Sequence, residues 1–162
     1  MEGWYFAQSN NCLRYGDNRG IVIGETHTVD ITEKQLEMCE WGLHASKRVI
    51  DALKYAPGPM VYRVKLSGKV LHQSDKSVAE HRTYLWGYDA TDVLLLFARR
   101  CALDVVHLWD APQVVIDYLK TGDEKLRTAA RAAAWAAAWA AVRAAAGVKQ
   151  NRRLTSMIVA GR

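Results

Sequence analysis

Alternation between hydrophobic and polar positions runs through the first 72 residues and predicts short β-strands. We expect strands at residues 3–7, 20–24, 26–31, 43–45, 60–66 and 69–72. Asn, Asp and Gly residues separate the early strands, and Ser67-Gly68 predicts a hairpin turn between the last two. Residues 32–38 are expected to form a helical turn.

One short helix is predicted among these strands. Ser46 is expected to be its N-cap, and the helix is expected to end near Tyr55. Val49, Ile50 and Leu53 recur at helical spacing, so we expect them to face the core.

Helical periodicity replaces the alternation after Asp75. Asp89 or Thr91 is expected to cap a helix that ends near Val106. Its apolar residues fall on one row and predict a stripe that faces the core. The row consists of Leu94, Phe97, Ala98, Cys101, Val105 and Leu108.

Two further helices complete the predicted fold. Pro112 favours the start of one, Gly122 favours its end, and Asp123 is a suitable cap for the next. The fold class is therefore expected to be α+β: a small N-terminal antiparallel or mixed sheet with one short helix, then C-terminal helices ending in a long Ala-rich one. We expect a compact part at 1–124 and a basic helical part at 125–162, forming one domain overall.

The final predicted helix has an unusual repeat. Thirteen of the 20 residues from Arg127 to Ala146 are alanine, which has the highest helix propensity. Every fourth position carries a large side chain: Arg127, Arg131, Trp135, Trp139 and Arg143. A four-residue step advances roughly 40° around the helix axis, so the two tryptophans share a face.

Charge is distributed unevenly along the 162 residues. The net charge is +5, yet eight basic residues and no acidic residue follow Glu124. The remainder holds 14 basic and 17 acidic residues. Such asymmetry favours an anionic partner for the C-terminal part, and the acidic body of the chain itself is an alternative partner.

Several classes of protein receive no support from the sequence. No apolar run reaches 18 residues, and the N-terminal residues lack a secretory signal pattern, so we expect a cytoplasmic protein without a membrane segment. The three cysteines form no Cys-x-x-Cys pair, and the five histidines are scattered. We therefore expect neither a metal site nor a cofactor.

His44 is the first candidate for chemistry. It lies where a strand is expected to meet a helix, a place where a histidine can serve as a general base. The alternative is a half-buried histidine bonded to neighbouring backbone groups.

Two charged segments, at 75–77 and 80–82, are interpreted as a solvated loop and a solvated strand face. Residues 16–20 have the Gly, Asp and Asn of a turn but lack the glycine spacing of a nucleotide-binding fingerprint.

The motif Cys-Glu-Trp-Gly-Leu-His-Ala-Ser at 39–46 is followed by Asp-Ala-Leu-Lys-Tyr-Ala-Pro-Gly at 51–58 and then by the Ala/Trp/Arg tract. In this combination the chain resembles a family of small phage and prophage proteins that join a Gly-Leu/Phe-His-Ala domain to Ala/Trp/Arg repeats. The resemblance implies a phage origin, and with it a role against a host defence.

Over residues 43–65 the chain is also similar to compact ADP-ribosyltransferases. That resemblance implies an enzyme that modifies a host factor with a nucleotide cofactor, centred on His44 and Tyr55.

The function favoured by these patterns is that of a phage-encoded, non-enzymatic binding protein in the host cytoplasm, an anti-CRISPR-like inhibitor. Its partner is expected to be a host protein or ribonucleoprotein with an acidic or nucleic-acid surface. The alternatives are the ADP-ribosyltransferase-like enzyme and a structural protein that self-associates through the Ala/Trp helix. The predicted partner-binding residues are Arg127, Arg131, Trp135, Trp139, Arg143, Lys149, Arg152 and Arg153.

Overall fold

The computed structural model describes residues 1–138 of the chain. The chain divides into two compact units, Met1–Leu94 and Leu95–Arg162, and each is described by itself. The first holds an antiparallel sheet with one short helix and the second holds helices, so the predicted α+β class is confirmed. The predicted division into 1–124 and 125–162 stays a prediction.

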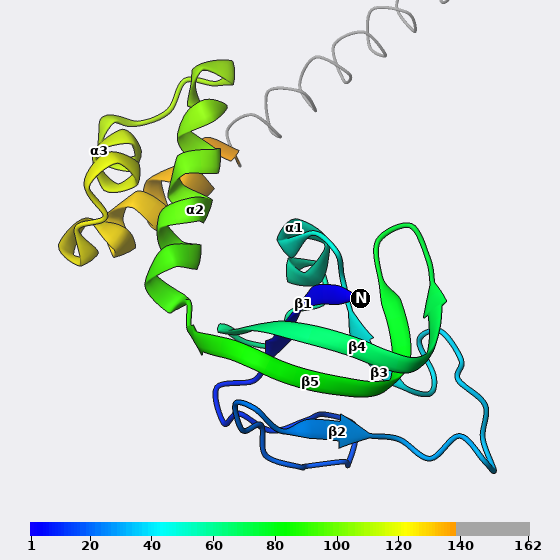
Figure 1. Ribbon diagram of the computed structural model, residues 1–162. Coiled ribbons are helices and arrows are strands. Elements are labelled where there is room, and N and C mark those ends of the chain that lie inside the picture. Colours follow the sequence, from blue (N-terminus) through cyan, green and yellow to red (C-terminus); the bar gives the residue numbers. More distant parts are fainter. Residues whose placement is uncertain (139–162) are drawn as a thin grey trace, which may run out of the picture. The chain divides into compact units, whose positions relative to one another are not determined.

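Five strands form one antiparallel sheet in the first unit (Figure 1). They are β1 (Glu2–Ala7), β2 (Thr26–Thr28), β3 (Leu43–Ala45), β4 (Met60–His72) and β5 (Ser77–Asp89). The order is β1-β4-β5-β2, and β3 pairs with the first residues of β5. The two long strands β4 and β5 are thus the centre of the sheet, and the three short strands lie along their outer edges.

The sheet bends until β1 meets the end of β3. Trp4 of β1 exchanges two backbone hydrogen bonds with Ser46, with N···O distances of 2.7 and 2.9 Å. Gly3 makes this approach feasible, because a Cβ there would lie 2.9 Å from the Ser46 carbonyl oxygen. Strands at opposite edges of the sheet are therefore brought side by side.

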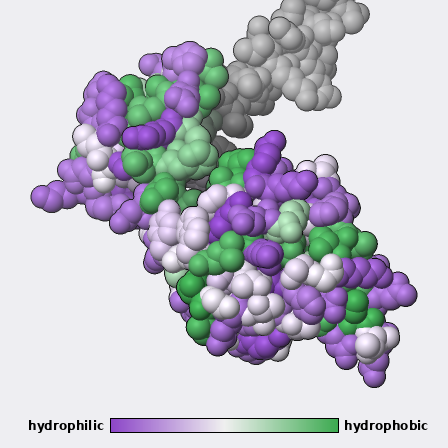
Figure 2. Space-filling view, viewed as in Figure 1, coloured by the Kyte–Doolittle hydropathy of each residue, from purple (hydrophilic) through white to green (hydrophobic). Residues whose placement is uncertain are grey.

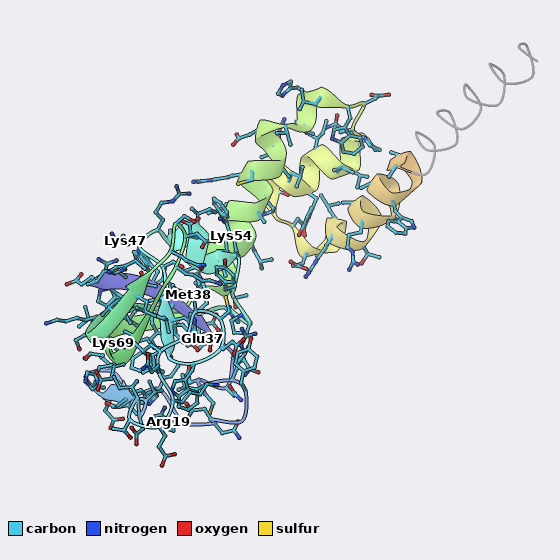
Figure 3. The ribbon with its side chains drawn as sticks, turned by 90° about the vertical axis from the view of Figure 1, so that its right-hand side faces the viewer. Arg19, Glu37, Met38, Lys47, Lys54 and Lys69 are labelled. Atoms are coloured by element: carbon cyan, nitrogen blue, oxygen red, sulfur yellow. The ribbon has the colours of Figure 1, made fainter. Side chains whose placement is uncertain are left out.

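Hydrophobic residues are buried on both faces of the sheet. One face is covered by α1 (Val49–Leu53), which is flanked by Lys47 and Lys54 (Figure 3). Buried residues on that side are Phe6, Ala52, Val61 and Ala90. The other buried cluster consists of Ala7, Ala45, Tyr62, Val64, Leu66, Ala79 and Tyr84.

Several predicted strands are corrected by the structure. Residues 69–72 continue β4 through an irregularity between Ser67 and Val70, where Gly68 has a φ of +71°, so no hairpin turn exists there. The segment after Asp75 begins with the 13-residue β5 and not with a helix. The strand was not predicted from the sequence, because the buried Arg82 interrupts the row of apolar residues on the buried face of β5.

Other local predictions were also wrong. Residues 20–24 contain one bridge followed by a turn, and 32–38 form bends and a bridge and no helical turn. The short helix begins at Val49 and not after Ser46, because the Ser46 backbone is paired with Trp4. Val49 and Ile50 are exposed, whereas the neighbouring Asp51 and Ala52 are buried.

The helices of the second half are α2 (Thr91–Asp104), the short η1 (Val106–Leu108), α3 (Gln113–Thr121) and a helical segment at 124–138. As predicted, α3 ends at Gly122, which has a φ of +72°. Asp123 caps the next helix, since its carboxylate accepts the Lys125 N–H at 2.9 Å.

The predicted core stripe on α2 was wrong except at Leu94, which packs against the buried cluster of Phe6 and Ala52, and no residue of this helix is fully buried. Apolar residues occupy five consecutive positions, 93–97, so they point in all directions and cannot share one face. Val93, Leu95, Leu96 and Phe97 are all exposed, and hydrophobic surface is visible on the helices in Figure 2. None of the helices within 1–138 combines the length and hydrophobicity that a membrane crossing requires.

Candidate functional site

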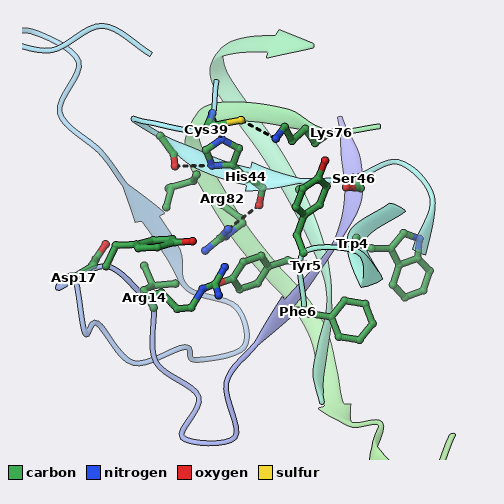
Figure 4. A pocket seen from close by; sticks show the side chains of 17 residues that line it. Trp4, Tyr5, Phe6, Arg14, Asp17, Cys39, His44, Ser46, Lys76 and Arg82 are labelled. Carbon is green, nitrogen blue, oxygen red and sulfur yellow. Dashed lines mark hydrogen bonds between the residues drawn. The ribbon is translucent and has the colours of Figure 1, made fainter. Parts of the chain in front are cut away.

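A pocket of about 380 Å³ opens in the first unit where β1 meets β3 (Figure 4). Its walls come from β1, the loop at 13–17, the segment 39–46, the α1 region and β5. This volume lies within the range of small-molecule sites. The closure of the sheet therefore creates a hollow large enough for a ligand.

Arg82 of β5 is the central polar residue of this pocket. Its side chain is almost completely buried, with a relative exposure of 2% for the residue. One terminal nitrogen donates to the His44 carbonyl oxygen at 2.7 Å, while Nε and the other terminal nitrogen donate to the Tyr84 hydroxyl at 3.0 and 2.8 Å. The guanidinium also lies 3.7 Å from the centre of the Tyr5 ring. All these contacts are to neutral groups.

The Tyr84 hydroxyl links Arg82 to His27. Because it accepts two N–H groups from Arg82, its own proton is free to be donated to His27 Nδ1, 3.0 Å away. His27 Nε2 then donates to the Gly20 carbonyl oxygen at 3.0 Å. This arrangement requires a neutral imidazole, and burial correspondingly lowers the pKa of His27.

No carboxylate within the described residues forms an ion pair with Arg82. Asp17 is the acid that lines the pocket, and it already binds Arg19 at 2.6 Å. That bond to Arg19 is the main reason why the pKa of Asp17 is lowered. The positive charge of Arg82 thus remains uncompensated by a nearby acid.

Two further cations, Arg14 and Lys76, line the same pocket. The Arg14 guanidinium lies 4.8 Å from the centre of the Tyr15 ring. Lys76 lies 4.5 Å from the centre of the Tyr55 ring, and its Nζ is 2.7 Å from Cys39 Sγ. The pocket therefore combines positive charge with aromatic surface, a combination suited to an anionic ligand that carries a ring.

Both predicted catalytic candidates, His44 and Tyr55, line this pocket. His44 Nε2 accepts the Cys39 backbone N–H at 3.1 Å, and its Nδ1 lies 3.1 Å from the Gly42 carbonyl oxygen. Nδ1 must therefore carry the proton, and burial lowers the pKa of this neutral imidazole. The geometry is that of the alternative given above, a half-buried histidine whose ring nitrogens are hydrogen-bonded to neighbouring backbone groups. The Tyr55 hydroxyl donates to Asp75 at 2.7 Å.

The predicted partner-binding residues are only partly described. Arg127, Arg131 and Trp135 lie in the helical segment 124–138, where Trp135 is 69% exposed and Arg127 pairs with Glu124 at 3.2 Å. The other five lie outside the described residues: Trp139, Arg143, Lys149, Arg152 and Arg153.

Sequence reasoning missed Arg82, which was expected on a solvated strand face. The available signal was its two-residue offset from Tyr84, because alternate residues of a strand share a face. Reasoning from sequence also missed Lys76 and Arg14, since nothing local shows that the loops carrying them approach β3. Across residues 1–138, no group of three or more His, Cys, Asp or Glu side chains is placed to hold a metal ion.

Acidification is expected to destabilise the first unit, because His27 and His44 are both held neutral. In the unfolded chain these residues titrate near pH ~6.5. Their folded pKa values are lowered, so below about pH 6.5 the unfolded chain binds more protons. The free energy of unfolding should therefore decrease as the pH is lowered below about 6.5, until the pH reaches the lower pKa values of the folded state.

Urea unfolding between pH 7.5 and 5 measures this slope. The variant His44→Gln should flatten it, whereas His107→Gln, at an exposed position, should leave it unchanged. Equal slopes for the wild type and His44→Gln would contradict the assignment of His44 as a half-buried histidine that is held in its neutral form.

Comparison with known proteins yields one family. The sequence model described as a domain of unknown function (DUF7666) matches residues 10–96. This range contains Arg14, His44, Lys76, Arg82 and the other pocket residues except those of β1. Neither the curated proteins nor the solved structures provide a match. The chain belongs to the DUF7666 family.

Proposed function

We propose that the first unit binds a small anionic ligand of the nucleotide class in the pocket between β1 and β3. The observation that carries this proposal is the buried charge of Arg82, which has no carboxylate partner among the described residues. Burying a charge without an opposite charge is costly, so such residues usually pair with an anion.

Arg82 also retains donors for that anion. A guanidinium has five N–H groups, and the three hydrogen bonds given above use one from each nitrogen. One N–H therefore remains on each of the two terminal nitrogens. These two donors can bind oxygens of a phosphate, a group for which arginine is a preferred partner.

The aromatic residues that line the pocket favour a ligand with a planar ring. Trp4, Tyr5 and Phe6 come from β1, while Tyr15 and Tyr55 line the pocket from two loops. Bases stack on aromatic side chains, with a contribution of about 1–3 kcal/mol per base. The neighbouring cations Arg14 and Lys76 add attraction for a second phosphate (Figure 4).

Calorimetric titration with ADP, adenosine and pyrophosphate tests the proposal. ADP is expected to bind more tightly than either fragment, because it engages both the cations and the aromatic wall. The variant Arg82→Gln should weaken ADP binding by about 10- to 100-fold, the effect of losing a charge-assisted hydrogen bond of about 1.5–3 kcal/mol.

Two further variants separate a loss of ligand binding from a loss of folding. Arg14→Gln changes a loop residue and should weaken ADP binding without affecting the sheet. Lys69→Gln is the control, since Lys69 is an exposed cation of β4 that lies outside the pocket lining. Binding of ADP that neither Arg82→Gln nor Arg14→Gln weakens would refute the proposal.

The alternative of an ADP-ribosyltransferase-like enzyme also involves a bound nucleotide, but it requires a catalytic side chain as well. His44 does not offer one in this geometry, since both ring nitrogens are engaged with backbone groups of the segment 39–42. We therefore propose binding and assign no transfer reaction to His44.

A second proposed function is the binding of an acidic partner, such as a nucleic-acid-loaded host defence complex, by the basic helix. The observation in its favour is the exposure of Arg127, Arg131 and Trp135 along one helical segment. The Arg127–Glu124 pair is solvent-exposed, so it holds Arg127 only weakly.

Fluorescence anisotropy with a 20-nucleotide DNA probe tests the basic helix. Replacing Arg127 and Arg131 by Gln should lower the slope of log K against log salt by about 1–2, as expected for two lost phosphate contacts. The control replaces Arg100 and Lys120, which are exposed on α2 and α3. Identical salt slopes for the wild type and the Arg127/Arg131 variant would exclude this surface.

A further inference from the structure

We propose that Cys39 is a nucleophile at the edge of the pocket and forms a covalent bond with an electrophilic carbon carried by the anionic ligand. This inference rests on the proposed function, because the ligand is the one held by Arg82. It adds a chemical role for a residue that binding alone does not need.

The contact between Cys39 and Lys76 is the first observation. Cys39 Sγ lies 2.7 Å from Lys76 Nζ, and both residues line the pocket. An ammonium at this distance stabilises negative charge on the sulfur, which is the nucleophilic form of cysteine. The Cys39 thiol in turn raises the pKa of Lys76, so Lys76 keeps its positive charge at neutral pH.

The surroundings hold this pair in place. The Cys39 backbone N–H donates to His44 Nε2, and the residue has a φ of +71°, in a region unusual for a side chain with Cβ. On the other side, Lys76 lies over the Tyr55 ring, whose hydroxyl donates to Asp75. His44 and Tyr55 are therefore positioning residues for the thiol and the ammonium.

The buried guanidinium of Arg82 indicates, separately from the Cys39–Lys76 contact, that the pocket binds an anion. Its buried guanidinium belongs to the same pocket lining as Cys39, and it lacks an acidic partner within the described part of the chain. An anion at Arg82 would lie in the hollow that Cys39 borders (Figure 4).

The bond-forming step balances without an oxidant or a metal ion. Cys39 releases its thiol proton to water, and the sulfur lone pair attacks the electrophilic carbon. An S–C bond forms, and the bond from that carbon to the leaving group breaks. The leaving group departs with the electron pair, and Lys76 remains protonated beside the product. The three cationic residues of the pocket, Arg14, Lys76 and Arg82, select electrophiles that carry negative charge.

Competing alkylation by iodoacetate and iodoacetamide tests the proposal on the intact chain. Iodoacetate is anionic and iodoacetamide is neutral, and both react by the same displacement of iodide. Peptide mass spectrometry measures the rate at each cysteine. Cys101 is the internal reference, because it is exposed like Cys39 but lies on α2.

We expect the iodoacetate-to-iodoacetamide rate ratio at Cys39 to exceed that at Cys101 by about tenfold, the effect of a nearby positive charge or two. Lys76→Met should lower both the rate and the ratio at Cys39, while Lys65→Met, at an exposed residue of β4, should change neither. Saturating ADP should protect Cys39 and leave Cys101 reactive.

Equal ratios at Cys39 and Cys101, or a Lys76→Met variant that reacts like the wild type, would overturn the covalent role. The binding proposal is judged separately with Cys39→Ser. If this variant still binds ADP, the pocket stands as a binding site without the thiol chemistry. If ADP fails to bind the wild type, the proposed function fails, whatever the alkylation result.

Discussion

The buried guanidinium of Arg82 joins the strands around the pocket through hydrogen bonds. Arg82 binds the backbone of β3 through the His44 carbonyl oxygen and reaches β2 through Tyr84 and His27. The proton positions along this path follow from the donors, since the two histidines must be neutral to accept the hydrogen bonds they receive. One cation therefore orders both short strands that pair with the outer edge of β5.

Closure of the sheet and burial of the cation depend on each other. The Trp4–Ser46 bridge brings β1 against the end of β3 and thereby places the Tyr5 ring 3.7 Å from the guanidinium. The bridge thereby helps to separate the guanidinium from water. With it, the cation lies in a hollow lined by aromatic rings, where an anion is stabilised more strongly than at an open surface. Arg14 and Lys76 extend the same positive environment.

The sequence predicted the class of fold and much of the helical half, because caps such as Asp123 and stops such as Gly122 act locally. It failed on β5, where charged residues interrupt the alternation and where Arg82 occupies a buried position. Of the site, His44 was identified from its position between a predicted strand and a predicted helix, and Tyr55 from the resemblance to ADP-ribosyltransferases. The remaining pocket residues could not be predicted, since their proximity arises from strand pairings between residues far apart in the chain.

The central claim is that Arg82 carries a buried positive charge that a bound anion completes. Thermal unfolding of the wild type and of Arg82→Met, with and without pyrophosphate, tests it most directly. We predict that pyrophosphate stabilises the wild type by about 2.7 kcal/mol at a hundredfold excess over Kd, and stabilises Arg82→Met by only about 0.4–1.4 kcal/mol at the same concentration, as a 10- to 100-fold weaker Kd requires. Equal stabilisation of the two proteins, or none in the wild type, would contradict the account.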